Sequence, residues 1–398
     1  MELCFLQSNS LFSTAVCLKS AHSVQCRKQW CACCTTQHEI RNTKKMPERF
    51  KNILIIKPSS LGDIVLALPA LTALRRSFPD SRISWLIRPE FAALLENHPH
   101  LDAIIPFDRK FLGKAWFHPG ALGALISLAG RLRDGRFDAV FDFQGLFRTA
   151  SLAWLSGCKR RFGRAGAREF AHFFYTDKVA QDMNCAHLVD YYLKIIATAD
   201  AGEICAEFVL PQQPAAVESI ARLLTSHGTA PDNYAVLVPG SAHRDKCWPT
   251  SRFAELADRI AAQYDLSIVA TGTEPEASVV EALREKAHVA IANLAGQTSL
   301  SELIALLRGA KLVVSNDTGP GHIAAASGVP LVLMFGRSNP LRVEPYRRKE
   351  CVVAIDPEGR GLDINSTDPR HDIKAITVDQ VWQKAREQLE NPNPKSQA

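Results

Sequence analysis

The stretch Asn52-Ile-Leu-Ile-Ile-Lys57, followed by Pro58-Ser-Ser-Leu-Gly62 and Asp63, decides the fold class of this chain. An uninterrupted run of leucine and β-branched residues is typical of a strand that is buried on both faces of a parallel sheet. The proline and glycine that follow predict a tight turn, and a helix is expected to open at Asp63. A strand, a turn and a helix in this order form the repeating unit of a doubly wound α/β domain.

The same unit recurs along the chain and divides it into two domains. Strand-like runs lie at 52–57, 83–87, 103–107, 139–143, 234–239, 266–271, 289–292, 311–314 and 330–335. Helical patterns lie at 91–97, 121–133 and 378–390. A proline-containing stretch at 210–214 interrupts the alternation. We therefore expect two Rossmann-like doubly wound domains, residues 46–210 and 211–376, and a C-terminal helix and tail at 377–398.

The beginning of the chain differs from the rest. Six of the eleven cysteines precede Met46, and no strand or helix periodicity is visible there. We interpret residues 1–45 as a disordered extension or one that the native protein lacks, with Met46 as the start. A signal peptide and a soft-metal site in the Cys31-x-Cys33-Cys34 cluster are the alternatives.

Composition excludes several classes of protein. The chain has 398 residues, 46% of them hydrophobic, which suits two globular domains and excludes a disordered or fibrous protein. The net charge of +6 suits an anionic ligand or a membrane surface. No apolar run approaches the roughly 18 residues of a membrane span, so membrane contact would be peripheral. A nicotinamide-dependent oxidoreductase is not favoured because neither domain carries Gly-x-Gly-x-x-Gly, and 8% aromatic residues give little support for RNA binding.

The loops at the carboxyl ends of the strands are the candidate sites, because ligands of doubly wound sheets bind there. Asp63 follows the first strand, where its carboxylate can be a general base or simply a helix cap. Residues 313–326 pass from a strand through a glycine-rich turn into a helix, whose N-terminus suits a phosphate. In that turn Asp317 can cap the helix or bind a ligand hydroxyl, and His322 can reach the anion or pack in the interior.

A third loop, residues 239–249, combines hydroxyl, guanidinium and ammonium groups. Such a composition suits a diphosphate, with Lys246 as a point charge. The alternative is a solvated basic loop.

Four motifs of the chain together resemble one known family. They are Leu61-Gly62-Asp63, Leu68-Pro69-Ala70-Leu71, Lys246-Cys247-Trp248-Pro249 and Asp317-Thr318-Gly319-x-x-His322. In this order they resemble the lipopolysaccharide heptosyltransferases of glycosyltransferase family 9, over roughly residues 50–390. The resemblance implies a GT-B fold, in which two Rossmann-like domains face each other across a cleft. It implies an N-terminal half that receives the acceptor and a C-terminal half that holds a nucleotide sugar, typically ADP-heptose.

The resemblance also implies chemistry and residue roles. The transfer is expected to invert the anomeric centre and to need no divalent metal. The matched positions are Asp63 as general base, Ser241 and Lys246 near the donor phosphates, Thr318, Gly319 and His322 in the phosphate-binding turn, and Asp317 at the donor sugar or its phosphate. Glu276 resembles the acidic residue that binds the adenosine ribose, with a carboxylate favoured by a helix dipole as the alternative.

The acceptor side is marked mainly by charge. Residues 131–170 contain nine Lys or Arg against four Asp or Glu. On one face, these side chains would suit the phosphates and acidic sugars of a lipopolysaccharide inner core and an anionic membrane surface. The alternative is a set of solvated helix faces. The candidate acceptor-binding residues are Gln144, Arg148, Arg161, Arg164 and Arg168.

We therefore expect a cytoplasmic enzyme that contacts the inner membrane peripherally and binds no nucleic acid. The cysteine before Trp248 and the Gly319-Pro320-Gly321 turn depart from the family pattern. Two alternatives follow, namely a family member that uses another nucleotide sugar or acceptor, and a nucleotide-sugar binding protein without turnover.

Overall fold

The computed structural model of the chain describes residues 50–202, 204–357 and 359–391. The expectations for residues 1–45, including the cysteine cluster, and for the last residues of the tail lie outside these ranges. Within the described ranges, no helix is long and apolar enough to cross a membrane.

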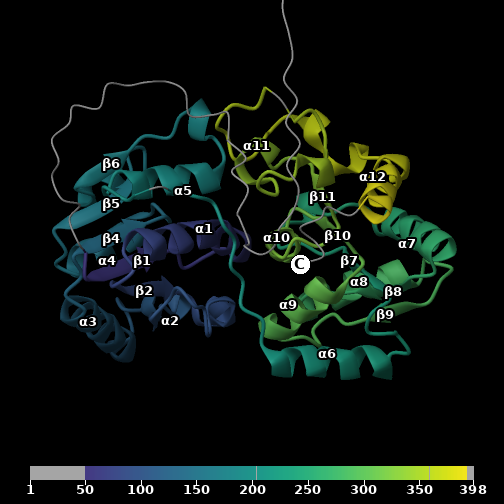
Figure 1. The fold of residues 1–398 in the computed structure, drawn as a ribbon, viewed down its shortest axis with the longest axis horizontal. Coiled ribbons are helices and arrows are strands. Elements are labelled where there is room, and N and C mark those ends of the chain that lie inside the picture. Colours follow the sequence, from purple (N-terminus) through teal and green to yellow (C-terminus); the bar gives the residue numbers. More distant parts are fainter. Residues whose placement is uncertain (1–49, 203, 358, 392–398) are drawn as a thin grey trace, which may run out of the picture. The chain divides into compact units, whose positions relative to one another are not determined.

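Six parallel strands form the first sheet, in the order β3-β2-β1-β4-β5-β6 (Figure 1). Their bounds are β1 Asn52–Ile56, β2 Arg82–Ile87, β3 Ala103–Pro106, β4 Ala139–Asp142, β5 Arg160–Arg164 and β6 Asp177–Val179. The central strand β1 pairs with β2 and β4, and Ile53 to Ile56 have no exposed surface. Burial on both faces explains why this strand is apolar without interruption.

Six further parallel strands form the second sheet, in the order β12-β11-β10-β7-β8-β9. Their bounds are β7 Tyr234–Val238, β8 Ser267–Ala270, β9 Ile291–Asn293, β10 Leu312–Asn316, β11 Leu331–Phe335 and β12 Val352–Ala354. Every residue of β7, β10 and β11 is buried. The predicted α/β class with two doubly wound sheets is confirmed.

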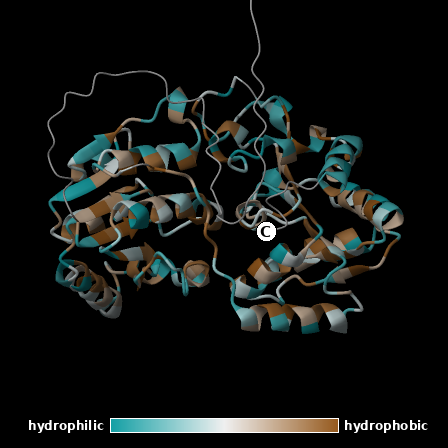
Figure 2. Ribbon diagram, in the orientation of Figure 1, coloured by the Kyte–Doolittle hydropathy of each residue, from teal (hydrophilic) through white to brown (hydrophobic). Residues whose placement is uncertain are grey.

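Helices connect the strands. The α-helices are α1 Leu61–Ser77, α2 Arg109–Leu112, α3 Pro119–Asp134, α4 Phe147–Leu155, α5 Leu188–Ala197, α6 Pro214–Ser226, α7 Thr250–Tyr264, α8 Ala277–Arg284, α9 Leu300–Gly309, α10 Gly319–Ala326, α11 Pro340–Val343 and α12 Val378–Glu390. The 3₁₀ helices are η1 Pro89–Leu94, η2 Ala171–Phe174, η3 Met183–Cys185, η4 Arg244–Lys246, η5 Glu274–Glu276, η6 Lys349–Cys351, η7 Pro369–His371 and η8 Ile373–Ala375. Helix α6, at the bottom of Figure 2, alternates hydrophobic and hydrophilic residues because it buries Ala216, Ile220 and Leu224 along one face.

Both sheets share one topology, which places the site. In each, the chain runs outward to one edge, returns to the middle and then runs to the other edge. The reversal lies between β1 and β4 in the first sheet and between β7 and β10 in the second. Ligands of such sheets bind at this point, outside the carboxyl ends of the strands. The loops after these four strands are therefore the ones that can hold substrate.

Local predictions need three corrections. Helix α1 begins at Leu61 rather than at Asp63, because Ser60 is its N-cap. The helix expected at 91–97 is instead the 3₁₀ helix η1, and Asn97 has the left-handed φ of 58° that ends helical structure. The strands β5, β6 and β12 had no prediction. β5 has the sequence RRFGR, and β6 and β12 have only three residues each, so none shows a recognisable strand pattern.

Candidate functional site

The N-terminal ends of α1 and α10 pack against each other and bring the loop after β1 to the loop after β10. Glycines allow the close approach. A Cβ on Gly62 would lie 2.6 Å from Cδ2 of His322, and a Cβ on Gly319 would lie 2.5 Å from Cδ2 of Leu61. Real Cβ contacts stay above about 3.0 Å. The two turns that the sequence singled out, one in each half of the chain, therefore meet.

Asp63 occupies the first turn of α1 and is held there by one of its two oxygens. Oδ2 accepts hydrogen bonds from the backbone N–H of Ser60 at 3.1 Å and from Oγ of Ser60 at 3.0 Å, and it lies 3.6 Å from Nζ of Lys57. These hydrogen bonds and the ion pair, within the described residues, all use Oδ2, and the side chain is 33% exposed. The helix-cap role is thus confirmed, and Oδ1 is left for a further partner.

Lys57 keeps the Asp63 carboxylate ionised. Burial raises the pKa of Asp63, but the Lys57 ammonium and the Ser60 hydrogen bonds outweigh it, and the pKa lies below its usual value. Lys57 is itself buried. Burial lowers its pKa, but Asp63, Tyr192 and Asp142 together raise it above the usual value. Sequence reasoning did not single out Lys57, although a lysine at the end of an apolar buried strand was a visible signal.

Three charged or titratable groups from the second half form a cluster, in which Asp317 and His322 are buried and Lys246 is partly exposed. Nζ of Lys246 lies 2.8 Å from Oδ2 of Asp317, and Nε2 of His322 lies 3.2 Å from Oδ1 of the same carboxylate. Burial alone would raise the pKa of Asp317, but His322 and Lys246 lower it well below its usual range. Both oxygens of Asp317 thus have partners. The packing interpretation of His322 is correct in that the ring is buried, yet it also faces the site through Gly62.

The N-terminus of α10 has no side-chain cap. Thr318 is the N-cap residue, but its hydroxyl makes no cap hydrogen bond and lies 3.1 Å from Oγ of Ser315 instead. Pro320 in the first turn has no N–H group to satisfy. The amides of this turn and the positive end of the helix dipole therefore face the region between Lys246 and α1, where an anion would be stabilised.

Asn316 holds the loop after β7 to the end of β10. Its Oδ1 accepts a hydrogen bond from the backbone N–H of Trp248 at 3.0 Å, and its Nδ2 donates to the carbonyl of Pro239 at 2.9 Å. The side chain is fully buried. Asn316 therefore fixes the loop that carries Lys246, a role that no local sequence pattern could reveal because its partners are 68 and 77 residues away.

Glu276 and Ser241 lie at the neighbouring strand ends. Oε2 of Glu276 accepts hydrogen bonds from the N–H and Oγ1 of Thr273, at 2.7 and 2.8 Å, so it caps η5 as the alternative interpretation expected. The carboxyl group also lies against Gly240, where a Cβ would come within 2.5 Å of Cδ. Ser241 Oγ accepts a hydrogen bond from the N–H of His243 at 3.3 Å. Both side chains thus border the loop after β7.

The loop after β4 is organised by the buried carboxylate of Asp142. It accepts hydrogen bonds from the hydroxyl of Tyr175 at 2.7 Å and from the N–H groups of Gln144 and Gly145 at 2.8 and 3.2 Å. Oε1 of Gln144 is buried without a hydrogen-bond partner among the described residues. Since β4 pairs with β1, this unsatisfied acceptor lies at the next strand end to the Asp63 turn.

The arginines expected on the acceptor side do not behave alike. Arg161 belongs to β5, and its guanidinium donates to the carbonyls of Phe174, at 2.6 Å, and Cys158, so it holds a neighbouring loop. Arg164 ends the same strand, and Arg148 lies in α4 partly exposed. Arg168 is exposed. The alternative of solvated helix faces is wrong for the stretch 160–164, because it is a strand.

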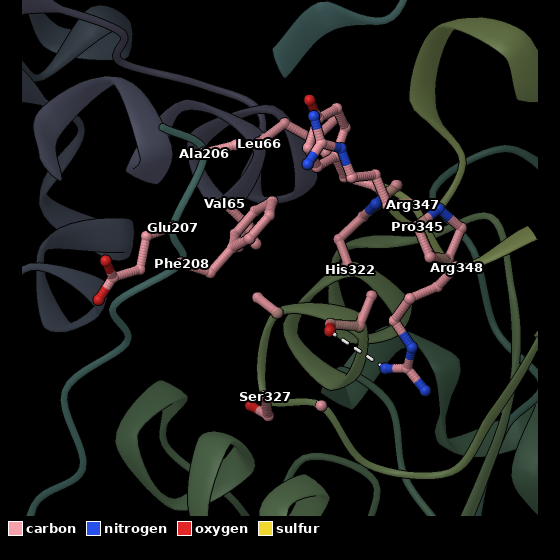
Figure 3. A pocket seen from close by; sticks show the side chains of 14 residues that line it. Val65, Leu66, Ala206, Glu207, Phe208, His322, Ser327, Pro345, Arg347 and Arg348 are labelled. Carbon is pink, nitrogen blue, oxygen red and sulfur yellow. Dashed lines mark hydrogen bonds between the residues drawn. The ribbon is translucent and has the colours of Figure 1, made fainter. Parts of the chain in front are cut away.

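A cavity of 370 Å³ lies next to the contact between α1 and α10 (Figure 3). Its walls come from the first turns of α1, from residues 206–208, from the C-terminal half of α10 and from residues 345–348. In the close-up, the side chain of Arg348 turns toward α10, where Nη1 donates to the carbonyl of Ala325 at 3.3 Å. Only His322 is common to this cavity and the cluster around Asp317, so the cavity is not the candidate site.

No group of three or more His, Cys, Asp or Glu in the described ranges is arranged to hold a metal ion. The cationic and amide groups described above are of the kind that binds an anion. The arrangement thus offers an ionised carboxylate on one side and a cationic, amide-lined turn on the other.

Comparisons with known proteins give a consistent result. Residues 125–372, more than half of the chain, match the family model described as glycosyltransferase family 9 (heptosyltransferase). The chain is 27% identical over 313 residues to the lipopolysaccharide core heptosyltransferase OpsX of Haemophilus influenzae, a match that covers 77% of this chain and 85% of OpsX.

Solved structures agree. A glycosyltransferase family 9 protein from Veillonella parvula superposes with a TM-score of 0.72 at 24% identity, over 86% of this chain and 98% of that one. Escherichia coli heptosyltransferase WaaC, solved with ADP-2-deoxy-2-fluoro heptose, superposes with a TM-score of 0.62 at 26% identity, over 84% of this chain and 99% of WaaC. The predicted GT-B arrangement of two Rossmann-like halves is confirmed by these similarities.

Proposed function

The chain belongs to glycosyltransferase family 9, and from this premise we propose that it transfers a heptose from ADP-heptose to the inner core of lipopolysaccharide. The names of its relatives support the lipopolysaccharide core as acceptor, and WaaC with a fluorinated ADP-heptose supports the donor. The observation that carries the proposal is the contact of α1 with α10. It brings the turn that carries Asp63 against His322, which shares the carboxylate of Asp317 with Lys246, and this supports a site between the two turns.

In this proposal, Asp63 is the general base. Its Oδ1 takes the proton from the acceptor hydroxyl as the hydroxyl oxygen attacks the anomeric carbon of the heptose. The bond from that carbon to the phosphate oxygen breaks on the opposite face, and ADP leaves with the bonding electron pair. Attack and departure on opposite faces invert the anomeric centre. Lys57 supports this role because it holds Asp63 ionised and anchors Oδ2, so that Oδ1 is the oxygen free to act.

The leaving diphosphate gains negative charge, and the second half supplies the groups that stabilise it. We assign this role to Lys246 and to the uncapped N-terminus of α10 at Thr318 and Gly319, with the hydroxyl of Ser241 alongside. Because these groups are cationic or amide donors, the proposed transfer needs no divalent metal. Asp317 and His322 act as positioning residues, since both oxygens of Asp317 are used to hold Lys246 and His322.

We propose two further parts of the site from the positions of their residues, one for the donor and one for the acceptor. Glu276 borders Gly240 in the loop after β7 and is proposed to bind the ribose of the donor. On the acceptor side we retain Gln144, Arg148, Arg164 and Arg168, because Gln144 has a buried unpartnered oxygen near the Asp63 turn. Arg161 is left out because its guanidinium is taken up by backbone carbonyls.

The proposed acceptor is a membrane lipid, so we place the enzyme peripherally on the cytoplasmic face of the inner membrane. The proposed domain limits are those expected from the sequence, with the acceptor bound by residues 46–210 and the donor by 211–376. Each sheet lies within one of these ranges.

The test is release of ADP from ADP-heptose, with a deacylated, Kdo-bearing lipid A core as acceptor and EDTA in the buffer. Asp63→Asn keeps the shape of the side chain and removes the base, so the rate of release is expected to fall about 10²–10⁴-fold while ADP still binds. Asp232→Asn, at an exposed carboxylate of the second half, is the matched control and keeps the wild-type rate.

The outcomes separate the alternatives. Full activity of the Asp63→Asn variant would remove Asp63 from the mechanism. Binding of ADP without acceptor-dependent release would favour another acceptor or a nucleotide-sugar binding protein without turnover. Absence of ADP binding would overturn the donor assignment.

A further inference from the structure

A segment after β3 exposes several large apolar side chains. Trp116 and Phe117 expose 91% and 92% of their surface, and Phe111 exposes 38%. Leu122 and Ile126, one turn apart on α3, expose 47% and 64%. Apolar side chains gathered in this way mark a contact surface, whereas single exposed ones are ordinary.

The same segment is strongly basic. Residues 109–133 contain no Asp or Glu and five Lys or Arg, and Arg109, Lys110 and Lys114 are exposed next to the aromatic residues. The short helix α2 and the turn after it hold these three basic side chains and Trp116 within eight residues of chain. We call residues 109–126 the aromatic–basic segment.

The segment starts at the carboxyl ends of the strands of the first sheet, where the candidate site also lies. It follows β3, and all strands of this sheet are parallel, so it starts at the same end of the strands as the loops with Asp63 and Gln144. The connection after β5 starts at that end too. It exposes Phe170 and Phe173 by 73% and 70%, and their rings stack at 6.3 Å. Exposed aromatic residues thus flank the site loops on both sides.

We propose that the aromatic–basic segment docks on an anionic lipid bilayer by inserting Trp116 and Phe117 at the level of the headgroups. Aromatic rings favour this interfacial layer, and exposed ammonium and guanidinium groups are attracted to lipid phosphates. The absence of acidic residues removes the repulsion that an anionic surface would otherwise meet. This assigns the membrane contact to residues 109–126 rather than to the basic cluster at 131–170.

The inference rests on the proposed function in one respect, that the acceptor is a membrane lipid. Docking at this edge would present the sugar end of such a lipid to the Asp63 turn without pulling its acyl chains from the bilayer. Only β2 separates β3 from β1 in the sheet, so the segment starts two strands away from the Asp63 turn, and this supports the geometry.

The experiment measures sedimentation of the full chain with vesicles of phosphatidylcholine alone or mixed with phosphatidylglycerol. We expect binding to the anionic vesicles that falls about tenfold in the double variant Trp116→Ser/Phe117→Ser, equivalent to about 1.4 kcal/mol. The control Val217→Ser removes an apolar residue that is 42% exposed on α6 and leaves binding unchanged. Lys110→Gln/Lys114→Gln is expected to weaken binding to anionic vesicles and to reduce its dependence on salt, because only Arg109 of the three exposed basic residues remains.

Two results would overturn the inference. One is a wild-type chain that does not sediment with anionic vesicles. The other is a double aromatic variant that binds them as the wild type does, which would leave the patch for a protein partner. Circular dichroism and the melting temperature check that the variants fold. Transfer to the deacylated, soluble acceptor is measured in parallel and should be unchanged in the aromatic variant. If no transfer occurs with any acceptor, the proposed function fails, whereas the vesicle result stands by itself.

Discussion

Replacing Gly62 by alanine tests whether the contact between α1 and α10 builds the site. The new Cβ would lie 2.6 Å from Cδ2 of His322, whereas ordinary contacts begin at 3.4 Å, so one of the two groups must move by about 0.8 Å. The imidazole is buried and lies 3.2 Å from Oδ1 of Asp317. A shift of this size away from Asp317 would break that hydrogen bond.

The expected cost follows from these contacts. Overpacking costs about 1–3 kcal/mol, and a lost hydrogen bond to a charged group costs about 1.5–3 kcal/mol. Alanine in place of glycine in a helix returns about 1 kcal/mol. We expect the Gly62→Ala variant to lose about 1.5–5 kcal/mol in free energy of unfolding. Its kcat/KM should fall about 10–100-fold, since misplacement by about 1 Å has effects of that order.

Urea unfolding followed by far-UV circular dichroism measures the stability, and ADP release measures the activity. The matched control is Gly130→Ala on α3, where a Cβ would meet nothing within 4 Å. That variant should keep full activity and gain about 0.5–1 kcal/mol. If Gly62→Ala is as stable and active as Gly130→Ala, the two helices do not hold the close contact described above, and Asp63 does not depend on that contact for its place in the site.

Three further predictions concern charge. In Lys57→Met, the ammonium no longer offsets burial, so the pKa of Asp63 rises, and the acid limb of the pH profile of kcat/KM should move to higher pH; an unmoved limb would separate Lys57 from the base. Asp317 has a lower pKa in the folded chain than its unfolded value near 3.9, so it stabilises the fold above that pH and less as pH falls. Asp317→Asn should therefore cost about 3–5 kcal/mol at pH 7, and the loss measured by urea unfolding should shrink below about pH 4; a constant loss would contradict the charge pairing. Removing divalent metal with EDTA should leave the rate of ADP release unchanged, and a fall that Mg²⁺ restores would show that Lys246 and α10 do not suffice.

The sequence allowed the central strands and the doubly wound class to be predicted because burial on both faces leaves a strong local pattern. Residues 53–56 and 331–335 are apolar for that reason. Strand β5 and the edge strand β6 gave no such pattern, since Arg160 and Asp177 on them are partly solvated and pair with each other. A strand that forms because it pairs with a neighbouring strand, and not because its own residues alternate or are all apolar, cannot be predicted from hydrophobic periodicity.

The site was predictable in its turns but not in its contacts. Asp63 and His322 lie in the first turns of α1 and α10, and Lys246 lies in the short helix η4, and each of these turns follows a strand end and a glycine. Their arrangement depends on partners far along the chain, such as the approach of Gly62 to His322. The choice between cap and base for Asp63 also had no local answer, because one carboxylate oxygen serves the helix and the other does not.

The two helices that meet, α1 and α10, occupy different positions in the strand order that the two sheets share. Helix α1 follows the first strand of its sheet, whereas α10 follows the fourth strand of the other. One loop from each reversal point is therefore committed to joining the two halves. The loop after β4 is not part of that junction, whereas the loop after β7 is held to the end of β10 by Asn316 and Asp317. Mutations in residues 143–146 or 239–249 could therefore change what each half recognises, while the contact between α1 and α10 stays the same.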